Sequence, residues 1–348
     1  MRPSISVIIP TRGRPAKLAA CLDRLSRQTL PRERFEVLVG IDGPDRESRA
    51  ALTEFEANGR PTLVIVECPR VGIAGVKNRL IDRARGETLL FLNDDVEPDA
   101  DLLAKHAEAH AEVDGVAMIL GHSPWVTPDG ETRFDRLLAR SSMIFFYDQM
   151  AGETDRSRDW GYRHAWNLNL SIPRSAVDGV GGFTEVIANC CFEDLELAFR
   201  VERELGAPTL YRPDAAAPHN HRYTPFGYLD RERRLGYSAF GFAVAAPECA
   251  QATFRSDLRA DSEWERVESF VAEASRNERD LLARFVALGR EVIEDDEPDD
   301  WIASEYEAHL PLKRLAFAYG YLAARSGERW PGLVLPTDAA DARQASLC

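Results

Sequence analysis

The sequence predicts an α/β protein with a doubly wound, mostly parallel sheet and a helical extension at the C-terminal end. Three observations predict it. Short, almost continuously apolar segments alternate with amphipathic segments in the N-terminal third, which is typical of a parallel sheet covered on both faces. The 348 residues are 45% hydrophobic, enough for a large core. After Tyr228 the strand pattern stops and helical periodicity takes over.

The first four strands are expected where apolar runs end at glycine, proline or acidic residues. They are residues 5–10, 35–42, 62–68 and 88–92, and helices are expected at 14–30, 46–58 and 72–86. Because crossovers between parallel strands are right-handed, the carboxyl ends of these strands lie along one edge. Ligands of open α/β sheets bind in the crevice outside that edge.

The elements after Gly115 are less regular. Strands are expected at 116–126 and 165–174, and a final strand followed by a loop within 208–223. Helices are expected at 133–150 and from Glu193 onward, and a charged loop at 151–161. Segments 229–247, 263–289 and 301–325 have helical character. The pattern therefore predicts two domains, residues 1–227 with the sheet and residues 228–348 with helices, the second serving ligand binding or oligomerisation.

Composition excludes several classes of protein. The formal net charge of -14 argues against a protein that coats nucleic acid. No signal peptide is visible at the N-terminus, and no apolar run approaches the ~18 residues that span a membrane. The six cysteines form no CxxC pair, so we expect reduced thiols in a cytoplasmic protein. They are Cys21, Cys68, Cys190, Cys191, Cys249 and Cys348.

Polar residues follow each of the four strands at the predicted ligand-binding edge. The first strand leads into Thr11-Arg12-Gly13-Arg14, the second into Asp42-Gly43, the third to Arg70 and Gly72, and the fourth into Asn93-Asp94-Asp95. Adjacent carboxylates repel each other unless a cation or hydrogen-bond donors offset the charge. Asn93-Asp94-Asp95 is therefore either a solvated turn or a divalent-metal site.

Two further groups of residues are candidates for catalysis or metal binding. Glu193-Asp194 opens a helix, where the macrodipole favours acids and where a carboxylate also suits a general base. His219 and His221 lie in a proline-flanked loop and are either structural or metal ligands. Tryptophans at 125, 160 and 166 are core or interface residues, or aromatic faces on which a ligand ring stacks.

The order and spacing of these motifs resemble the family 2 inverting glycosyltransferases of the GT-A (Rossmann-like) fold. The resemblance covers roughly residues 4–222 and rests on "SVIIPTRGRP", "VLVGIDG", "GIAGVKNRLIDRARGETLLFLNDDVEPDADLL", "GGFTE", "FEDLELAFR" and "HNH". The "GGF…ED" block is also similar to the carboxyl-terminal motif of galactosyltransferase-type enzymes. The helical region after Tyr228 resembles no family that we can name.

The resemblance implies a donor site. Asp42 would bind the nucleobase, most often uracil, and Lys77 would lie near the diphosphate. Asp94 would contact the ribose or sugar, whereas Asn93 stands where many members have Asp, so a metal contact from position 93 is in doubt. The donor-binding residues implied are Pro10, Thr11, Arg14, Asp42, Gly72, Lys77, Asn93 and Asp94.

The resemblance also implies the catalytic groups. Asp194 would be the base and Glu193 would contact the acceptor. Mn²⁺ or Mg²⁺ would be held by Asp95 and by a histidine, His219 having the better spacing and His221 being the rival. Trp125 and Trp166 are the candidate acceptor-binding residues.

The implied activity is metal-dependent, inverting transfer of a sugar from a nucleoside-diphosphate sugar, UDP first, to an acceptor hydroxyl. Glycan, lipid-linked, peptide and small-molecule acceptors stay open, as does a homo-oligomer. The helical region, residues 228–348, is expected to bind the acceptor or to mediate oligomerisation. Two alternatives remain at this point. One is a nucleotidyltransferase acting on a sugar phosphate, and the other is a catalytically degenerate nucleotide-sugar-binding protein.

Overall fold

The computed structural model describes residues 2–57, 62–187, 192–294 and 297–328. The chain forms two compact units. The first comprises Met1–Val126, Gly152–Ala188 and Glu193–His221, and the second comprises Thr127–Ala151, Asn189–Phe192 and Arg222–Cys348. The predicted boundary between residues 227 and 228 stays a prediction.

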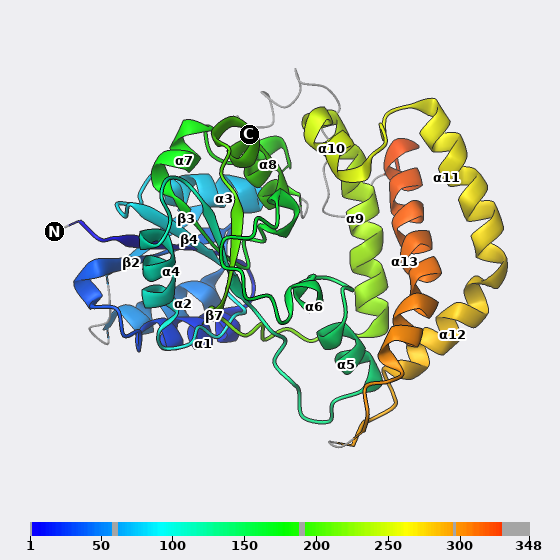
Figure 1. Ribbon diagram of the computed structural model, residues 1–348, viewed down its shortest axis with the longest axis horizontal. Coiled ribbons are helices and arrows are strands. Elements are labelled where there is room, and N and C mark those ends of the chain that lie inside the picture. Colours follow the sequence, from blue (N-terminus) through cyan, green and yellow to red (C-terminus); the bar gives the residue numbers. More distant parts are fainter. Residues whose placement is uncertain (1, 58–61, 188–191, 295–296, 329–348) are drawn as a thin grey trace. The chain divides into compact units, whose positions relative to one another are not determined.

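The first unit is built on a seven-stranded, mostly parallel sheet with helices packed on it (Figure 1). The strand order is β3-β2-β1-β4-β6-β5-β7, and β6 runs antiparallel to β4 and β5. This confirms the predicted α/β fold. The strands are β1 (Ile5–Thr11), β2 (Phe35–Asp42), β3 (Leu63–Cys68), β4 (Thr88–Leu92), β5 (Met118–His122), β6 (Asn169–Pro173) and β7 (Thr209–Ala216).

The central strands are buried on both faces, which explains their continuous apolar sequences. Val7, Ile8 and Ile9 of β1 are fully buried. β1 pairs in parallel with β2 on one side and with β4 on the other. The carboxyl ends of these three strands therefore meet at one edge, and Thr11, Asp42 and the residues after Leu92 lie there, as predicted.

The helices after β1, β2 and β3 begin near the predicted positions, but α1 ends at Leu25 and α3 at Ile81, each five residues before its predicted end, and α7 was not predicted. Pro15 occupies the first turn of α1, where its missing N–H costs nothing. The predicted face of α1, made by Leu18, Cys21, Leu22 and Leu25, is buried. The helices are α1 (Pro15–Leu25), α2 (Arg46–Ala57), α3 (Gly72–Ile81), α4 (Leu102–Ala111), α7 (Arg174–Gly179) and α8 (Glu193–Leu205).

The helix predicted over 133–150 is interrupted in the structure. It consists of α5 (Arg133–Arg140) and a single turn, α6 (Tyr147–Met150), with non-helical backbone between them. Ser141 ends α5 in an extended conformation, and its hydroxyl donates to the carbonyl oxygen of Leu137. Serine competes in this way with the backbone for hydrogen bonds, so the apolar pattern alone overestimates the helix.

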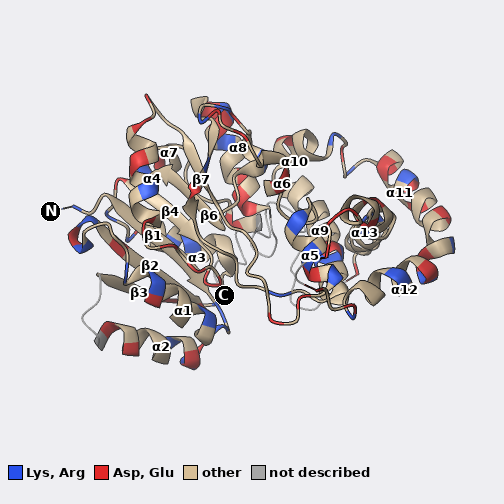
Figure 2. Ribbon diagram, turned by 60° about the horizontal axis from the view of Figure 1, so that its bottom comes forward, with Lys and Arg blue, Asp and Glu red and all other residues tan. Residues whose placement is uncertain are grey.

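The second unit is helical, as the sequence predicts. Its helices are α5, α6, α9 (Pro225–Ala245), α10 (Pro247–Phe254), α11 (Asp261–Ala274), α12 (Glu278–Leu288) and α13 (Ile302–Arg325). Acidic and basic side chains both occur along α11 and α12 (Figure 2). Within the described ranges, the search for a helix long and apolar enough to cross a bilayer found none.

Two glycines bring α9 and α13 into close contact. A Cβ atom built on Gly236 would lie 1.9 Å from the carbonyl oxygen of Phe317, and one on Gly320 would lie 1.8 Å from that of Arg233. Real Cβ atoms do not approach that closely, so each helix presents bare backbone to the other. The contact between the two helices therefore depends on both glycines.

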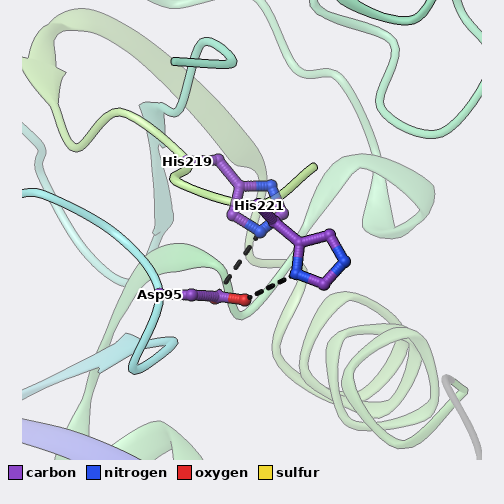
Figure 3. A group of neighbouring side chains, drawn as sticks. All are labelled: Asp95, His219 and His221. Atoms are coloured by element: carbon purple, nitrogen blue, oxygen red, sulfur yellow. Dashed lines mark ion pairs between the residues drawn. The ribbon is translucent and has the colours of Figure 1, made fainter. Parts of the chain in front are cut away.

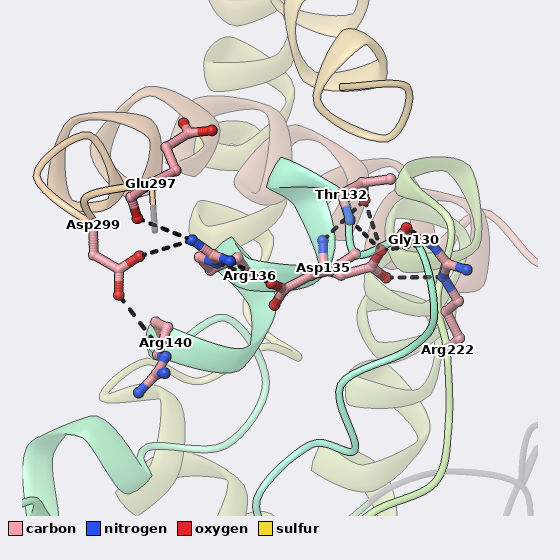
Figure 4. A network of polar contacts seen from close by, with 9 residues as sticks. Gly130, Thr132, Asp135, Arg136, Arg140, Arg222, Glu297 and Asp299 are labelled. Carbon is pink, nitrogen blue, oxygen red and sulfur yellow. Dashed lines mark hydrogen bonds and ion pairs between the residues drawn. The ribbon is translucent and has the colours of Figure 1, made fainter. Parts of the chain in front are cut away.

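A polar network fixes the start of α5 (Figure 4). Thr132 and Asp135 form a reciprocal capping box, which satisfies two N-terminal donors. Arg222 adds a bond from Nη2 to Asp135 Oδ2 at 2.7 Å, and Arg136 pairs with Glu131 at 2.6 Å. The capping carboxylate is thus also the anchor of Arg222.

The cysteine prediction can be compared with half of the thiols. Cys21, Cys68 and Cys249 are free and buried. Burial raises the pKa of the Cys21 thiol well above its usual range, and nearby Asp94 and Asp95 raise it further. These thiols are packing residues. Cys190, Cys191 and Cys348 lie outside the described residues.

Candidate active site and metal cluster

The acidic residues after β4 are held by groups that follow β1. Thr11 Oγ1 donates to Asp94 Oδ2 at 2.6 Å. The Arg14 guanidinium spans both acids, with Nη2 2.5 Å from Asp94 Oδ1 and Nη1 2.6 Å from Asp95 Oδ2. A planar guanidinium suits such paired carboxylate contacts. The segment is therefore a buried, organised group and not a solvated turn.

The two acids have different electrostatics. Burial raises the pKa of Asp94 to about 6, against the opposing effects of Arg14 and Thr11. Burial also disfavours the charged form of Asp95, but hydrogen bonds from His219 and His221 and the charge of Arg14 outweigh it. They hold the pKa of Asp95 well below its usual range. Asp95 is therefore the more persistent anion of the two.

Asp95 lies against both histidines of the predicted loop (Figure 3). His219 Nε2 is 3.5 Å from Asp95 Oδ1, and His221 Nδ1 is 3.3 Å from Asp95 Oδ2. One ligand atom from each of the three residues lies within 4.8 Å of the others. The sequence left the two histidines as rivals, and the structure brings both to the same carboxylate.

The chemistry of this donor set fits a divalent metal. One carboxylate and two imidazoles are ligands that transition metals such as Mn²⁺ accept, whereas Mg²⁺ is bound chiefly by oxygens. Burial lowers the pKa of His219, which keeps its imidazole in the neutral form that binds metals. Trp125 packs on His219 with ring centroids 4.5 Å apart, so this predicted acceptor residue lies beside the cluster.

Asp42 lies at the end of β2, as predicted, and one oxygen of its carboxylate accepts hydrogen bonds from backbone N–H groups. Its Oδ1 accepts from the N–H of Val71 at 2.8 Å and of Gly72 at 3.2 Å. Gly72 has a φ of +77°, a conformation that glycine adopts without strain, and it begins α3. This glycine therefore places two N–H groups on one oxygen of Asp42, and the other carboxylate oxygen is not part of these contacts.

The predicted catalytic pair lies at the start of α8, with Lys77 beside it. Lys77 Nζ is 3.0 Å from Glu193 Oε1, and the two side chains are 2% and 6% exposed. Lys77 Nζ also lies 4.9 Å from the ring centre of Phe183, in the "GGF" turn. The structure thus brings Lys77 to Glu193, and its predicted contact with a diphosphate stays a prediction.

Asp194 is oriented by the backbone on two sides. Its Oδ1 accepts from Leu195 N at 2.8 Å and its Oδ2 from Asn167 N at 3.4 Å. Burial raises the pKa of Asp194, and the neighbouring charge of Glu193 raises it further, while Lys77 and these backbone donors oppose the shift. A carboxylate with a raised pKa is a stronger base than an ordinary Asp, which suits proton abstraction.

Other predicted residues lie near these groups without a distinct role. Pro10 precedes Thr11 in β1, and Asn93 follows β4 directly. Trp166 lies 5.6 Å from His164 between ring centroids, and His164 lies 5.7 Å from Trp160. Binding roles for these four predicted residues stay predictions.

The sequence did not reveal several residues that position the site. Asn78 holds the glycine turn, because its Nδ2 donates to Phe183 O and its Oδ1 accepts from Phe183 N, each at 2.9 Å. Asn167 is 3% exposed and lies beside the candidate base. For Asn78 the sequence did hold a signal. Asparagine is disfavoured in the interior of a helix, so its position directly after Lys77 in a predicted helix indicates another role.

Replacing Lys77 tests whether its charge is needed where the structure places it. Lys77→Met leaves Glu193 buried without its partner, so we expect a loss of ~3–5 kcal/mol in the free energy of unfolding. Lys77→Met/Glu193→Gln should recover part of that loss. Urea unfolding of both variants measures this. Lys105→Met, which removes only an exposed pair with Glu108, is the control and should unfold like the wild type.

Comparison with known proteins identifies the family that this chain resembles in sequence and fold. The family model "Glycosyl transferase family 2" matches residues 6–178. The glycosyltransferase AglE of Haloferax volcanii is 24% identical over 181 residues, which are 52% of this chain and 56% of that protein. The validoxylamine A glucosyltransferase of Streptomyces hygroscopicus subsp. jinggangensis is 27% identical over 241 residues, covering 64% and 57% of the two chains.

A solved structure shows the same fold. It is the mannosyltransferase PcManGT from Pyrobaculum calidifontis in complex with GDP-Man and Mn²⁺, with a TM-score of 0.50 and 20% identity, covering 100% of this chain and 81% of that one. This likeness shows the GT-A fold. Residues 6–178 of the chain, which the family model matches, belong to glycosyl transferase family 2. The chain spans a little over half the length of the two curated relatives named above.

Proposed function

We propose that this protein transfers a sugar from a nucleoside-diphosphate sugar to an acceptor hydroxyl, with a divalent metal and with inversion at the anomeric carbon. The observation that carries the proposal is the cluster of Asp95, His219 and His221 at the carboxyl end of β4. The family membership supports the class of reaction. The cluster supplies what that reaction needs most, a place for the cation that accompanies a diphosphate.

Asp95, His219 and His221 would hold the metal, with Mn²⁺ favoured over Mg²⁺ because two of the three ligands are imidazoles. When bound, the ion neutralises the charge that develops on the diphosphate as the sugar–phosphate bond breaks. Arg14, whose side chain is 41% exposed, already lies against both acids and is able to contact the same phosphates. PcManGT was solved with GDP-Man and Mn²⁺, which supports a metal-assisted donor site in this fold.

Asp194 would remove the proton of the acceptor hydroxyl as that oxygen attacks the anomeric carbon. The attack comes from the face opposite the leaving diphosphate, so one displacement inverts the centre. Its raised pKa and its two backbone donors keep the carboxylate basic and oriented. Glu193, paired with Lys77, lies next to it and would fix the start of α8 against α3.

The nucleobase is proposed to be uracil. One oxygen of Asp42 already accepts two backbone N–H groups, so the other oxygen is available for one ligand donor. Uracil offers one ring N–H on its pairing edge, whereas guanine presents two neighbouring donors that match a carboxylate with both oxygens available. Asp42 therefore fits uracil better than guanine.

Nucleotide competition tests this assignment. We expect the wild type to bind UDP more tightly than GDP, ADP or CDP. Asp42→Asn should lose UDP affinity by ~10–100-fold, because its amide N–H₂ would face the uracil N–H and leave both groups unpaired. Calorimetry in Mn²⁺ measures both. A wild type that prefers GDP, or an Asp42→Asn variant with unchanged UDP affinity, would exclude the uracil contact. Glu67→Gln, on β3, is the control.

The reaction itself is tested by the release of free nucleoside diphosphate. A thermal-shift screen of nucleotide sugars with Mn²⁺ identifies the donor, because a ligand that binds only the folded state raises the melting temperature. The selected donor is then incubated with candidate glycan, lipid-linked, peptide and small-molecule acceptors. Binding without diphosphate release in every mixture would favour the degenerate binding protein. In a separate mixture of a nucleoside triphosphate and a sugar phosphate, release of pyrophosphate with formation of a nucleotide sugar would indicate a nucleotidyltransferase.

A further inference from the structure

Asn220 lies between the two histidines and is held from several sides. Its backbone N–H donates to the carbonyl oxygen of Asp95 at 2.8 Å. Its side-chain Nδ2 donates to Glu97 Oε1 at 2.6 Å. Lys17 Nζ, from α1, donates to the backbone oxygen of Asn220 at 2.7 Å and to its Oδ1 at 2.5 Å. Every one of these residues belongs to the first unit.

The backbone around Asn220 is extended and paired on both sides. Val96 and Trp125 each form an isolated β-bridge with His219. The N–H of His219 donates to Pro124 O at 2.7 Å, and the N–H of Val126 donates to His219 O at 3.1 Å. In extended backbone, alternate side chains point to opposite sides. This alternation matches the contacts, with His219 and His221 on Asp95 and the Asn220 side chain on Lys17 and Glu97.

Asn220 therefore fixes the two peptide units between the imidazoles. Its N–H, in the His219–Asn220 peptide, donates to Asp95 O, and its carbonyl oxygen, in the Asn220–His221 peptide, accepts from Lys17 Nζ. A rotation of either peptide would move a Cα atom that carries one of the histidines. The side-chain bonds to Lys17 and Glu97 resist that rotation.

We propose that Asn220, fixed by Lys17, is a positioning residue that holds His219 and His221 in register with Asp95 for metal binding. The inference rests on the proposed metal-dependent function. Asn220 and Lys17 do not themselves reach the Asp95 carboxylate in this arrangement; they act through the loop. Groups behind metal ligands typically contribute ~10–100-fold to metal affinity.

The experiment measures Mn²⁺ binding without any sugar substrate. Free Mn²⁺ is quantified by electron paramagnetic resonance during titration of the wild type, Asn220→Ala and Lys17→Met. We expect each variant to bind Mn²⁺ ~10-fold or more weakly. Lys17→Met/Asn220→Ala should lose less affinity than the two single losses combined, because both changes remove the bond from Lys17 Nζ to Asn220 Oδ1, while only Lys17→Met removes the bond to the backbone oxygen.

Arg24→Ala provides the matched control. Arg24 also contacts Glu97, at 3.2 Å, but its side chain is 51% exposed and does not contact Asn220 in the bonds above. We expect this variant to bind Mn²⁺ like the wild type. Thermal unfolding in EDTA reports the stability of each folded chain separately from its metal affinity.

The outcomes separate the inference from the function on which it rests. A wild type that binds no Mn²⁺ would overturn the proposed metal site itself. A wild type that binds Mn²⁺, with Asn220→Ala and Lys17→Met binding equally well, would overturn only the positioning role. If Asn220→Ala does not fold, Lys17→Met decides, since it keeps the asparagine and removes only one partly buried donor.

Discussion

Asp194→Asn is expected to lower the rate of sugar transfer by ~10²–10⁴, the usual contribution of a general base. The amide keeps the shape of the side chain and an oxygen that accepts from Leu195 N, but it cannot take a proton. Donor affinity should change little, because the proton transfer concerns the acceptor. Single-turnover transfer rates and donor calorimetry on the same preparations measure the two effects.

The pH dependence of the same reaction provides a second measurement. Burial and the charge of Glu193 raise the pKa of Asp194, so its basic form is lost at a higher pH than that of an ordinary Asp. The rate should fall on the acid side of a midpoint well above ~4, the usual Asp pKa. Asp194→Asn should lack this limb in its residual activity.

Glu193→Gln and Asp178→Asn complete the comparison. Asp178 lies on α7 in an exposed pair with Arg174, and its variant should transfer sugar normally. A fully active Asp194→Asn beside an inactive Glu193→Gln would assign the base to Glu193. If Asp194→Asn and Glu193→Gln are both fully active, neither Asp194 nor Glu193 takes part in proton transfer.

Asp95→Ala is expected to remove metal-dependent donor binding. Asp95 is the single carboxylate of the cluster, and each histidine lies within 3.5 Å of it. The loss of Mn²⁺ affinity should exceed the ~10–100-fold typical of a group outside the ligand shell. Calorimetry of UDP with Mn²⁺ and with EDTA measures it. In the wild type EDTA should weaken binding, and in Asp95→Ala it should have no further effect.

Asp99→Ala is the matched control for that experiment. Asp99 follows Asp95 by four residues and is exposed, with its backbone N–H bonded to Ala216 O. Its variant should bind UDP and Mn²⁺ like the wild type. Equal UDP affinity in Asp95→Ala and the wild type, with or without EDTA, would contradict a metal-dependent donor site.

Most of the sheet could be predicted because each strand is recognisable from its own apolar sequence. Val7, Ile8 and Ile9 are buried on both faces, so the sequence of β1 is apolar without interruption. The same reasoning placed Asp42 and the acids after Leu92 at one edge, because parallel strands end together. The break between α5 and α6 was not predictable from periodicity, because the apolar pattern continues through residues 143–147 while Ser141 adopts an extended conformation.

The partners within the site could not be predicted in the same way. Lys77 and Glu193 are 116 positions apart, and nothing local to either residue indicates the other. The resemblance to a known family predicted that Lys77 lies near the diphosphate. It did not predict the ion pair between Lys77 and Glu193. Asn220 was hidden for a different reason, because an asparagine between two histidines near a proline looks like an ordinary turn residue.

The glycine contact between α9 and α13 has a consequence for recognising evolutionarily related chains. The family model matches residues 6–178 and does not reach α9 and α13. Gly236 and Gly320 are a signature for these two helices, because backbone of the opposite helix occupies the place of a side chain at both positions. Chains that inherited this helical arrangement should keep glycine at both sites together. A related chain in which only one of these positions is glycine should have α9 and α13 farther apart than they are here.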